Sequence, residues 1–352
     1  MKRAIAISVV WLAAALWCAP AQPQVSKVRV GSCARTITSG MAPFAVAARM
    51  GWFNEEGIEV TLVPMAGSSD CVKAIATKEV PFVLAAVEAH AAALLQGVKA
   101  RKFYTAYQGN IYGLAVPADS PIEKVADLKG KTIGVISMGG GVLFTKGLIA
   151  SAGLNPETDV RIVVAGEGAQ TAAMVRNRQV DALSQFDTQY ALVENAGVKL
   201  RLLETKETDR FPGNGFLALD ETLKAHRAEA IGLARGYAKG TIFAINNPEA
   251  AVRILYEVYP ALRPTGKDEA TAIRDDVKVL QARIANWRLE KGGVSRWGES
   301  SEANYAAYLD FLLKWGVISA RVPVQDMITN ELIVEINRFD SAKIVADARG
   351  NR

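Results

Sequence analysis

Short runs rich in β-branched residues alternate with helix-length segments between residues 28 and 203, and this alternation constrains the fold more than any other feature of the chain. The predicted strands are VRVGS (28–32), IEVTLV (58–63), FVLAA (82–86), KTIGVI (131–136), VRIVV (160–164), DALSQF (181–186) and VKLRLL (198–203). Strands separated by helices favour parallel pairing, because each helix returns the chain to the same end of the sheet. The sequence therefore predicts an α/β fold with mainly parallel sheets flanked by helices.

The alternation is interrupted twice, which indicates two lobes. Residues 102–120 contain two adjacent strand-like pieces, and from Phe216 onward the sequence shows long helical patterns with apolar stripes. We expect one lobe to comprise residues 22–110 and 214–352, including the C-terminal helices, and the second lobe to comprise residues 111–213. The crossover segments near 108–113 and 209–215 are expected to form the hinge.

The first 21 residues have the layout of a secretory signal peptide. Two basic residues at positions 2 and 3 precede an apolar run over residues 4–17 and a small-residue sequence that ends at Ala21. The run is shorter than the roughly 20 residues that a membrane-spanning helix needs. We expect cleavage after Ala21 and a mature protein in the periplasm. A lipoprotein anchored through Cys18 is the alternative, which the preceding bulky Trp17 disfavours.

Composition and charge exclude several classes of partner and chemistry. Removing residues 1–21 lowers the formal net charge from +5 to +3 and leaves it evenly spread, so we expect no nucleic-acid partner. The two histidines, His90 and His226, lie in separate predicted helices without acidic companions at metal-ligand spacing. No Gly-x-Ser-x-Gly nucleophile motif occurs. We therefore predict no metal, no cofactor and no enzymatic activity, in a protein that is a monomer.

The mature chain keeps two cysteines, Cys33 and Cys71, each in a loop after a predicted strand. Two cysteines in an oxidising compartment favour a disulfide, and the two loops are expected at the same edge of one sheet. Two separate buried thiols are the alternative.

An internal match suggests that the two lobes are related. Residues 66–86 align without a gap on residues 165–185, with identical Ala-Gly pairs at 66–67 and 165–166. Both segments have the same predicted order of strand, loop, helix and strand, although identity is low and coincidence is the alternative. Extending the offset of 99 residues between Ala66 and Ala165 pairs Glu88 with Asp187.

Three segments together resemble a known family. AARMGWFNEEGIEVTLVP, ADLKGKTIGVIS and the segment that ends in NRQVDAL are similar to the NMT1/THI5-like substrate-binding proteins of ABC importers, whose ligands include nitrate, taurine, sulfonates and pyrimidines. The resemblance implies a two-lobe periplasmic-binding-protein fold of type II. It also implies capture of a small molecule outside the membrane and delivery to an ABC permease with its ATPase. A related enzyme of thiamine or menaquinone precursor synthesis, or a sensor subunit, is the alternative function.

The candidate ligand-binding residues follow the carboxyl ends of the predicted strands, because ligands of open α/β sheets bind there. The triple glycine that follows the 131–136 strand lets backbone amides approach a ligand, although a turn that needs glycine only for its dihedral angles explains it as well. Arg35 could pair with an organic anion, and Tyr107 could form an aromatic wall. Further candidates are Thr36, Ser39, Ser68, Ser69, Asn110, Ser137, Gly139, Gly140 and Gln185.

Glu88 and Asp187 are the most specific pair among the candidates. Two carboxylates on opposing walls of a cleft would favour an amine or a ring N–H donor between them. Two solvated acids near helix starts are the alternative. The glycine bend and Arg35 favour an organic anion, whereas the acid pair favours a planar nitrogen heterocycle, and the sequence leaves both open.

Overall fold

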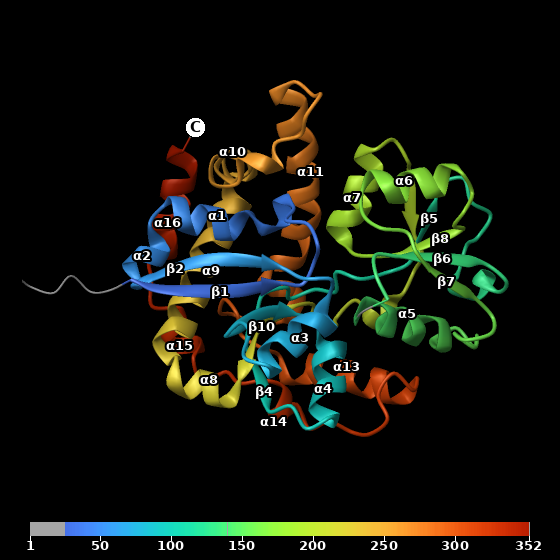
Figure 1. The fold of residues 1–352 in the computed structure, drawn as a ribbon, viewed down its shortest axis with the longest axis horizontal. Helices are drawn as coiled ribbons and strands as arrows, with labels where there is room; N and C mark the ends of the chain where they lie inside the picture. Colours follow the sequence, from blue (N-terminus) through green and yellow to red (C-terminus); the bar gives the residue numbers. More distant parts are fainter. Residues whose placement is uncertain (1–24, 139, 352) are drawn as a thin grey trace, which may run out of the picture.

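The computed structural model describes residues 25–138 and 140–351, and it contains two five-stranded sheets that lie in two lobes side by side (Figure 1). The strands of the first sheet are β1 (Ser26–Ser32), β2 (Ile58–Pro64), β3 (Phe82–Ala85), β4 (Ala100–Thr105) and β10 (Gly215–Leu219). Those of the second are β5 (Ala115–Pro117), β6 (Thr132–Val135), β7 (Arg161–Val164), β8 (Ala182–Ser184) and β9 (Leu200–Leu202). Each of the seven strands predicted between residues 28 and 203 is present.

Both sheets have the same plan. The strand order is β2-β1-β3-β10-β4 in one and β7-β6-β8-β5-β9 in the other. The first three strands of each order are parallel, and the fourth is antiparallel to both of its neighbours. That fourth strand, β10 or β5, directly follows a segment in which the chain crosses between the lobes. The two-lobe α/β prediction is confirmed, with sheets that are mixed.

The helical pattern predicted from Phe216 onward is wrong over its first residues. Gly215–Leu219 form β10, and all five residues are buried between β3 and β4. A short, continuously apolar run fits a buried strand as well as a helix, so periodicity could not separate the two. The helical region begins after this strand.

Helices cover both sheets. Those before the second crossover are α1 (Ala42–Arg49), α2 (Trp52–Glu55), α3 (Ser68–Ala76), α4 (Val87–Leu95), α5 (Gly140–Ser151), α6 (Ala169–Arg176) and α7 (Asp187–Asn195), with short 3-10 turns η1 (Ser39–Met41), η2 (Val125–Leu128) and η3 (Lys206–Thr208). Those after it are α8 (Asp220–Ala225), α9 (Arg227–Asn246), α10 (Pro248–Val258), α11 (Glu269–Trp287), α12 (Leu289–Gly292), α13 (Glu302–Lys314), α14 (Val324–Met327), α15 (Ile333–Ile336) and α16 (Ser341–Gly350), with the turn η4 (Pro260–Leu262).

An aromatic cluster fastens the long helix α9 to the first sheet. The Tyr237 ring lies 4.9 Å from that of Phe44 and 5.1 Å from that of Phe216, measured between centroids. All three side chains are buried, and aromatic pairs at such distances stabilise a core beyond the area they bury. Helices α1 and α9 thereby lie on this sheet, and α10 and α16 pack against them (Figure 1).

Helix α13 contributes to the core of the second lobe although it lies far along the chain. Its residues Tyr308 and Phe311 pack with Phe144 of α5, and Tyr308 stacks on Phe211 of the second crossover with ring centroids 4.5 Å apart. The assignment of all of residues 214–352 to the first lobe therefore stays a prediction.

No helix in the described part of the chain is long and apolar enough to cross a membrane. The predicted signal peptide and its cleavage position after Ala21 lie outside the described residues.

Candidate functional site

The carboxyl ends of strands from both lobes line one shared hollow. The first lobe contributes the segments after β1 and β2, and the second contributes the segments after β6 and β8. A cavity of about 40 Å³ is lined by Cys33, Ala34, Ala66, Gly67, Ser68, Tyr112, Val135, Ile136, Ser137, Gly141, Ser184, Gln185 and Phe186. A second cavity of about 30 Å³ shares four of these residues and adds Thr36, Thr38, Gly40, Met41, Leu84, Tyr107, Ile111, Thr188, Asn214 and Arg283. We call the two together the interlobe cleft.

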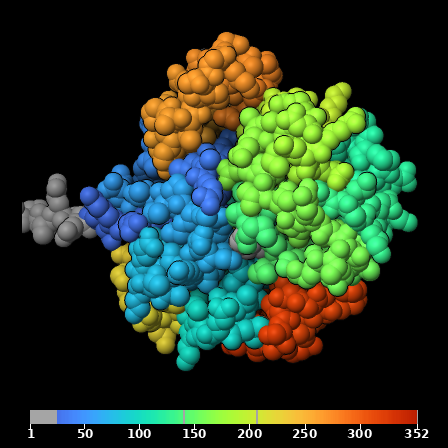
Figure 2. Space-filling view, turned by 45° about the vertical axis from the view of Figure 1, so that its right-hand side comes forward, coloured from blue at the N-terminus to red at the C-terminus, as the bar shows by residue number. Residues whose placement is uncertain are grey.

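The lobes are closed over this cleft, and Figure 2 shows them touching along their facing surfaces. Thr36 of the first lobe donates a hydrogen bond to the Glu167 carboxylate of the second. Ser137 Oγ donates to the carbonyl oxygen of Ala66 over 2.9 Å. Ligand sites usually enclose about 300 Å³ or more, so the two cavities are too small in this closed form for a guest much larger than a water molecule.

Arg283 of α11 forms a two-pronged ion pair between the lobes with Asp187, and it is absent from the residues predicted from the sequence. Its Nη2 lies 2.6 Å from Asp187 Oδ1 and its Nε lies 3.0 Å from Oδ2, at the start of α7. Asn286 Nδ2 donates to the same carboxylate over 2.9 Å, and the guanidinium lies 4.1 Å from the centroid of the Tyr107 ring. Burial opposes the charge on Arg283, but the Asp187 carboxylate outweighs it and raises the pKa of the guanidinium.

The sequence around Arg283 contains a pattern that could have identified it as a buried charged residue. It lies on the buried stripe of α11, four residues after Val279 and four before Trp287. A charged residue on an apolar stripe needs a buried partner, so this position could have been selected as a candidate for an ion pair.

Glu88 does not reach the cleft, which corrects the acid-pair hypothesis. Its side chain is fully buried, and Tyr308 Oη donates to its Oε2 over 3.1 Å. Burial raises the pKa of Glu88 to about 7 and lowers the pKa of the neighbouring Lys102 to about 7. Lys102 Nζ donates to the carbonyl oxygen of Ala85 over 2.9 Å. Because Glu88 lies outside both cavities and Asp187 is paired with Arg283, the two carboxylates do not face each other across the cleft.

The pairing of Glu88 with Asp187 came from a register error of one residue. In both lobes a residue with positive φ follows the first helix of the repeated unit, Lys78 (φ 60°) in one and Arg178 (φ 54°) in the other. The next helices start at Val87 and Asp187. The repeated unit therefore has an offset of 100 residues, and the position equivalent to Glu88 is Thr188.

The remaining predicted residues divide into two groups. Ser68, Ser137 and Gln185 line the first cavity, and Thr36 and Tyr107 line the second. The others line neither. They are Arg35 and Ser69, which are exposed; Ser39, which is buried at the start of η1; Asn110, whose amide donates to Thr208 Oγ1; and Gly140, which begins α5. Gly139 lies outside the described residues.

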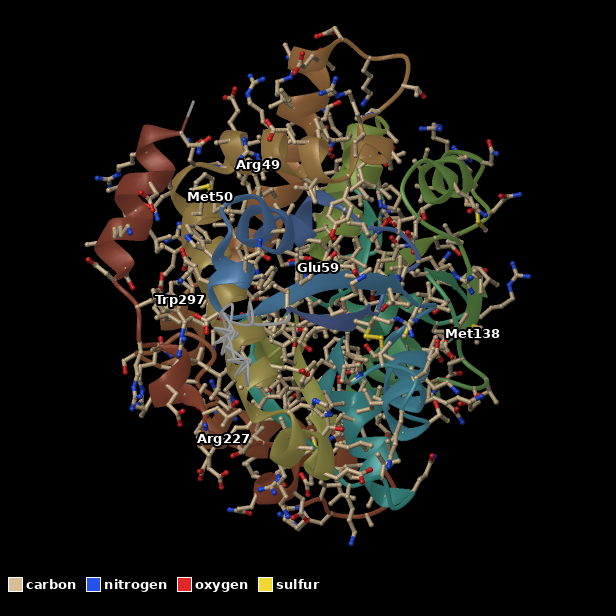
Figure 3. The ribbon with its side chains drawn as sticks, turned by 60° about the vertical axis from the view of Figure 1, so that its left-hand side comes forward. Arg49, Met50, Glu59, Met138, Arg227 and Trp297 are labelled. Carbon is tan, nitrogen blue, oxygen red and sulfur yellow. A yellow bond between two sulfur atoms is a disulfide. The ribbon has the colours of Figure 1, made fainter. Side chains whose placement is uncertain are left out.

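Two aromatic residues of the cleft were also missed. Tyr112 and Phe186 line both cavities, and their rings meet edge to face with centroids 6.3 Å apart. Tyr112 lies on the first crossover, and Phe186 lies two residues beyond β8. These positions in the sequence could have identified both residues as candidates for the cleft lining. Met138, on the bend after β6, is instead 60% exposed (Figure 3).

The disulfide prediction is confirmed. Cys33 and Cys71 are bonded, with Cα atoms 5.9 Å apart. The bond connects the loop after β1 to helix α3, and Cys33 lines both cavities. One wall of the cleft is therefore covalently fixed.

Neither histidine lines the cleft. His90 is fully buried with Nε2 2.9 Å from the carbonyl oxygen of Ala100, and burial lowers its pKa to about 3. His226 lies at the surface, 3.0 Å from Glu229. Within residues 25–138 and 140–351, no group of His, Cys, Asp and Glu side chains is suited to hold a metal ion.

Comparisons with known proteins agree with this geometry. The riboflavin-binding protein RibY of Chloroflexus aurantiacus is 26% identical over 296 residues, which cover 83% of this chain and 82% of the relative. The alkanesulfonate-binding protein SsuA from Xanthomonas axonopodis, bound to MOPS, superposes with a TM-score of 0.61 at 16% identity, over 86% of this chain and 98% of that one. The nitrate-binding protein NrtA from Synechocystis superposes with a TM-score of 0.63 at 12% identity, over 94% and 99%. The NMT1/THI5 like family matches residues 38–251, more than half of the sequence, and the chain belongs to this family.

Proposed function

We propose that this protein captures a small, neutral, planar nitrogen heterocycle in the interlobe cleft, outside the cytoplasmic membrane, and delivers it to an ABC permease with its ATPase. The observation that carries the proposal is the lining of the cleft. Three aromatic side chains, Tyr107, Tyr112 and Phe186, lie there among neutral hydrogen-bonding groups. Ligand sites of this kind combine apolar and aromatic walls with a few placed polar groups.

The charges of the cleft favour a neutral guest over an organic anion. Among the described residues that line the two cavities, Arg283 is the only charged one, and Asp187 neutralises it. Arg35, the predicted anion partner, is exposed and outside the lining. The relative RibY, which is named for riboflavin, a planar heterocycle, also supports a heterocyclic ligand. The alkanesulfonate-binding protein SsuA is similar to this chain in fold alone.

Binding requires an opening and closing movement. The crossover segments near 108–113 and 209–215 connect the lobes, and backbone rotation there would widen the cleft. A guest that contacts both lobes then stabilises the closed state, which is the form that we propose the permease recognises. A micromolar dissociation constant corresponds to about 8 kcal/mol, which several buried hydrogen bonds and a stacked ring can supply.

Native mass spectrometry of the purified protein, followed by thermal melting with riboflavin, uracil and MOPS, tests the proposal. A heterocycle that binds should raise the melting temperature in proportion to its occupancy, while MOPS should not. Stabilisation by MOPS alone would overturn the ligand class, and conversion of a bound compound to a product would overturn the transport function. Loss of uptake of the bound compound in cells that lack the gene tests delivery to a permease.

A further inference from the structure

Gln185, directly after β8, is held in one orientation within the cleft. It is 2% exposed and lines the first cavity. Its backbone N–H donates to Tyr190 Oη over 2.8 Å, and the same hydroxyl donates to the carbonyl oxygen of Gly113 over 2.7 Å. The main chain of Gln185 is thereby fixed to the first crossover.

The contacts of the Gln185 side chain determine which end of its amide is nitrogen. One end lies 3.1 Å from the carbonyl oxygen of Gly166 and 3.2 Å from Thr171 Oγ1. A carbonyl can only accept a hydrogen bond, and the Thr171 hydroxyl uses its hydrogen on the carbonyl oxygens of Ala165 and Gly166. Both neighbours are acceptors, so this end is the NH₂ group and both of its hydrogens are used.

The other end of the amide, Oε1, is buried and has no hydrogen-bond partner among the described residues. A buried acceptor without a partner is unfavourable, and it favours a guest that supplies a donor. Because Gln185 lines the first cavity, its Oε1 is an acceptor without a protein partner on the second-lobe side of the cleft.

Ser68, at the start of α3, offers a donor to the same cavity from the first lobe. Its Oγ accepts the backbone N–H of Ala86 over 3.0 Å, and the side chain is 5% exposed. This contact uses the oxygen as an acceptor and leaves the hydroxyl hydrogen for a guest. An acceptor and a donor are the two groups that a guest with an N–H beside a carbonyl, as in a lactam or imide, requires of its site.

We propose that Gln185 is the specificity-determining residue of the cleft: its Oε1 accepts the N–H of a lactam or imide edge, and Ser68 donates to the adjacent carbonyl. The inference rests on the proposed capture of a planar heterocycle and names the edge by which that guest is recognised. A guest held this way is bonded to both lobes, so its recognition favours the closed state.

Calorimetric titration with riboflavin, whose ring carries an imide, and with its N3-methyl derivative tests the inference. The wild-type protein should bind riboflavin about 10- to 100-fold more tightly than the methylated compound, as expected for one buried hydrogen bond. Gln185→Met has a similar shape without the acceptor, and it should bind both compounds equally at the weaker level. Ser68→Ala should weaken riboflavin binding by about 10-fold.

Two further variants separate recognition from folding. Gln179→Met changes an exposed glutamine before β8 and should keep the discrimination unchanged. Thr171→Val removes an acceptor that orients the amide and should reduce the discrimination while riboflavin still binds. Equal affinity of the wild-type protein for both compounds, or discrimination that persists in Gln185→Met, would overturn the inference and leave the transport proposal intact. Binding of MOPS with no binding of riboflavin or uracil would overturn the ligand class and the inference together.

Discussion

The repeated units of the two lobes, residues 64–97 and 164–197, share a backbone but differ in what holds them in place. Lys78 and Arg178 have φ angles of 60° and 54°, and Gly97 and Gly197 have φ angles of 89° and 88°. Equivalent positions carry different side chains, such as Glu88 and Thr188. The shared backbone indicates that turns and strand lengths determine the fold of each unit, whereas the side chains depend on the helix packed against it.

Helices α13 and α11, which contact the two repeated units, account for the different environments of Glu88 and Asp187. In the first lobe α13 covers the start of α4, and Tyr308 buries Glu88. In the second lobe α11 meets the start of α7, and Arg283 pairs with Asp187. One acid is therefore buried beside a lysine and a tyrosine, and the other is bound by an arginine.

Among variants that test this difference between the lobes, Arg283→Ala should have the largest effect on the free energy of unfolding. The change leaves the Asp187 carboxylate, whose side chain is only 11% exposed, without its charged partner, which should lower the free energy of unfolding by about 3–5 kcal/mol. Urea denaturation measures it, with Arg274→Ala as a control on an exposed position of the same helix, where we expect about 0.5 kcal/mol or less. A loss for Arg283→Ala as small as that of the control would contradict the role of the buried pair.

The second effect compares Cys71 with Thr171, which occupy equivalent positions. Cys71 is bonded to Cys33, whereas the Thr171 hydroxyl donates to backbone carbonyls of its own loop. The Cys33→Ser, Cys71→Ser double variant should lose about 2–4 kcal/mol of unfolding free energy. Thr171→Val should lose only about 1 kcal/mol. Equal losses in denaturant titrations would show that the two lobes depend on these positions to the same extent.

The third effect concerns the pH dependence of stability at Glu88. Because the pKa of Glu88 is raised to about 7 in the folded protein, the folded state binds more protons than the unfolded state between pH 4.5 and 7. Its contribution to stability is therefore lost as pH rises through this window, by up to about 1.4 kcal/mol per pH unit. Glu88→Gln should flatten this part of the stability profile.

The contribution of Lys102 to stability changes with pH in the opposite direction, and at higher pH. Its pKa is lowered to about 7, so between pH 7 and 10.5 the unfolded state binds more protons and the contribution of Lys102 to stability rises. Denaturation curves of wild-type and Glu88→Gln proteins from pH 5 to pH 9 measure both slopes. An unchanged slope below pH 7 in the variant would show that Glu88 does not titrate in this window.

The smallest effect is expected at the shared turn. Lys78→Gly and Arg178→Gly each relieve a positive φ angle, so each should raise the unfolding free energy by about 0.5–1 kcal/mol. Thermal melting of the two variants should give shifts of similar size. Stabilisation of one lobe but not the other would show that the backbone similarity does not extend to energetics.

The sequence was sufficient for features that depend on local patterns. Strand positions, the two-lobe plan and the Cys33–Cys71 bond follow from periodicity, crossover spacing and compartment. Gln185 and Ser68 could be predicted to lie in the cleft, where both line the first cavity, because the carboxyl ends of strands in such a fold converge.

The features that depend on register and on distant partners were missed. An alignment at low identity slipped by one residue, and this slip was enough to pair Glu88 with Asp187 instead of Thr188. Arg283 lies 96 residues from Asp187 along the chain, so no local pattern could connect them. The burial of Glu88 depends on Tyr308, which is 220 residues away.

The hydroxyl of Tyr190 contacts both the proposed recognition residue and the proposed hinge. It bonds the main chain of Gln185 on one side and the crossover carbonyl of Gly113 on the other. Under the proposed mechanism, a displacement of Gln185 toward a guest would act through this one oxygen atom on the crossover segment about which the lobes would rotate. Ligand recognition and lobe movement would then share a single hydrogen-bonded contact.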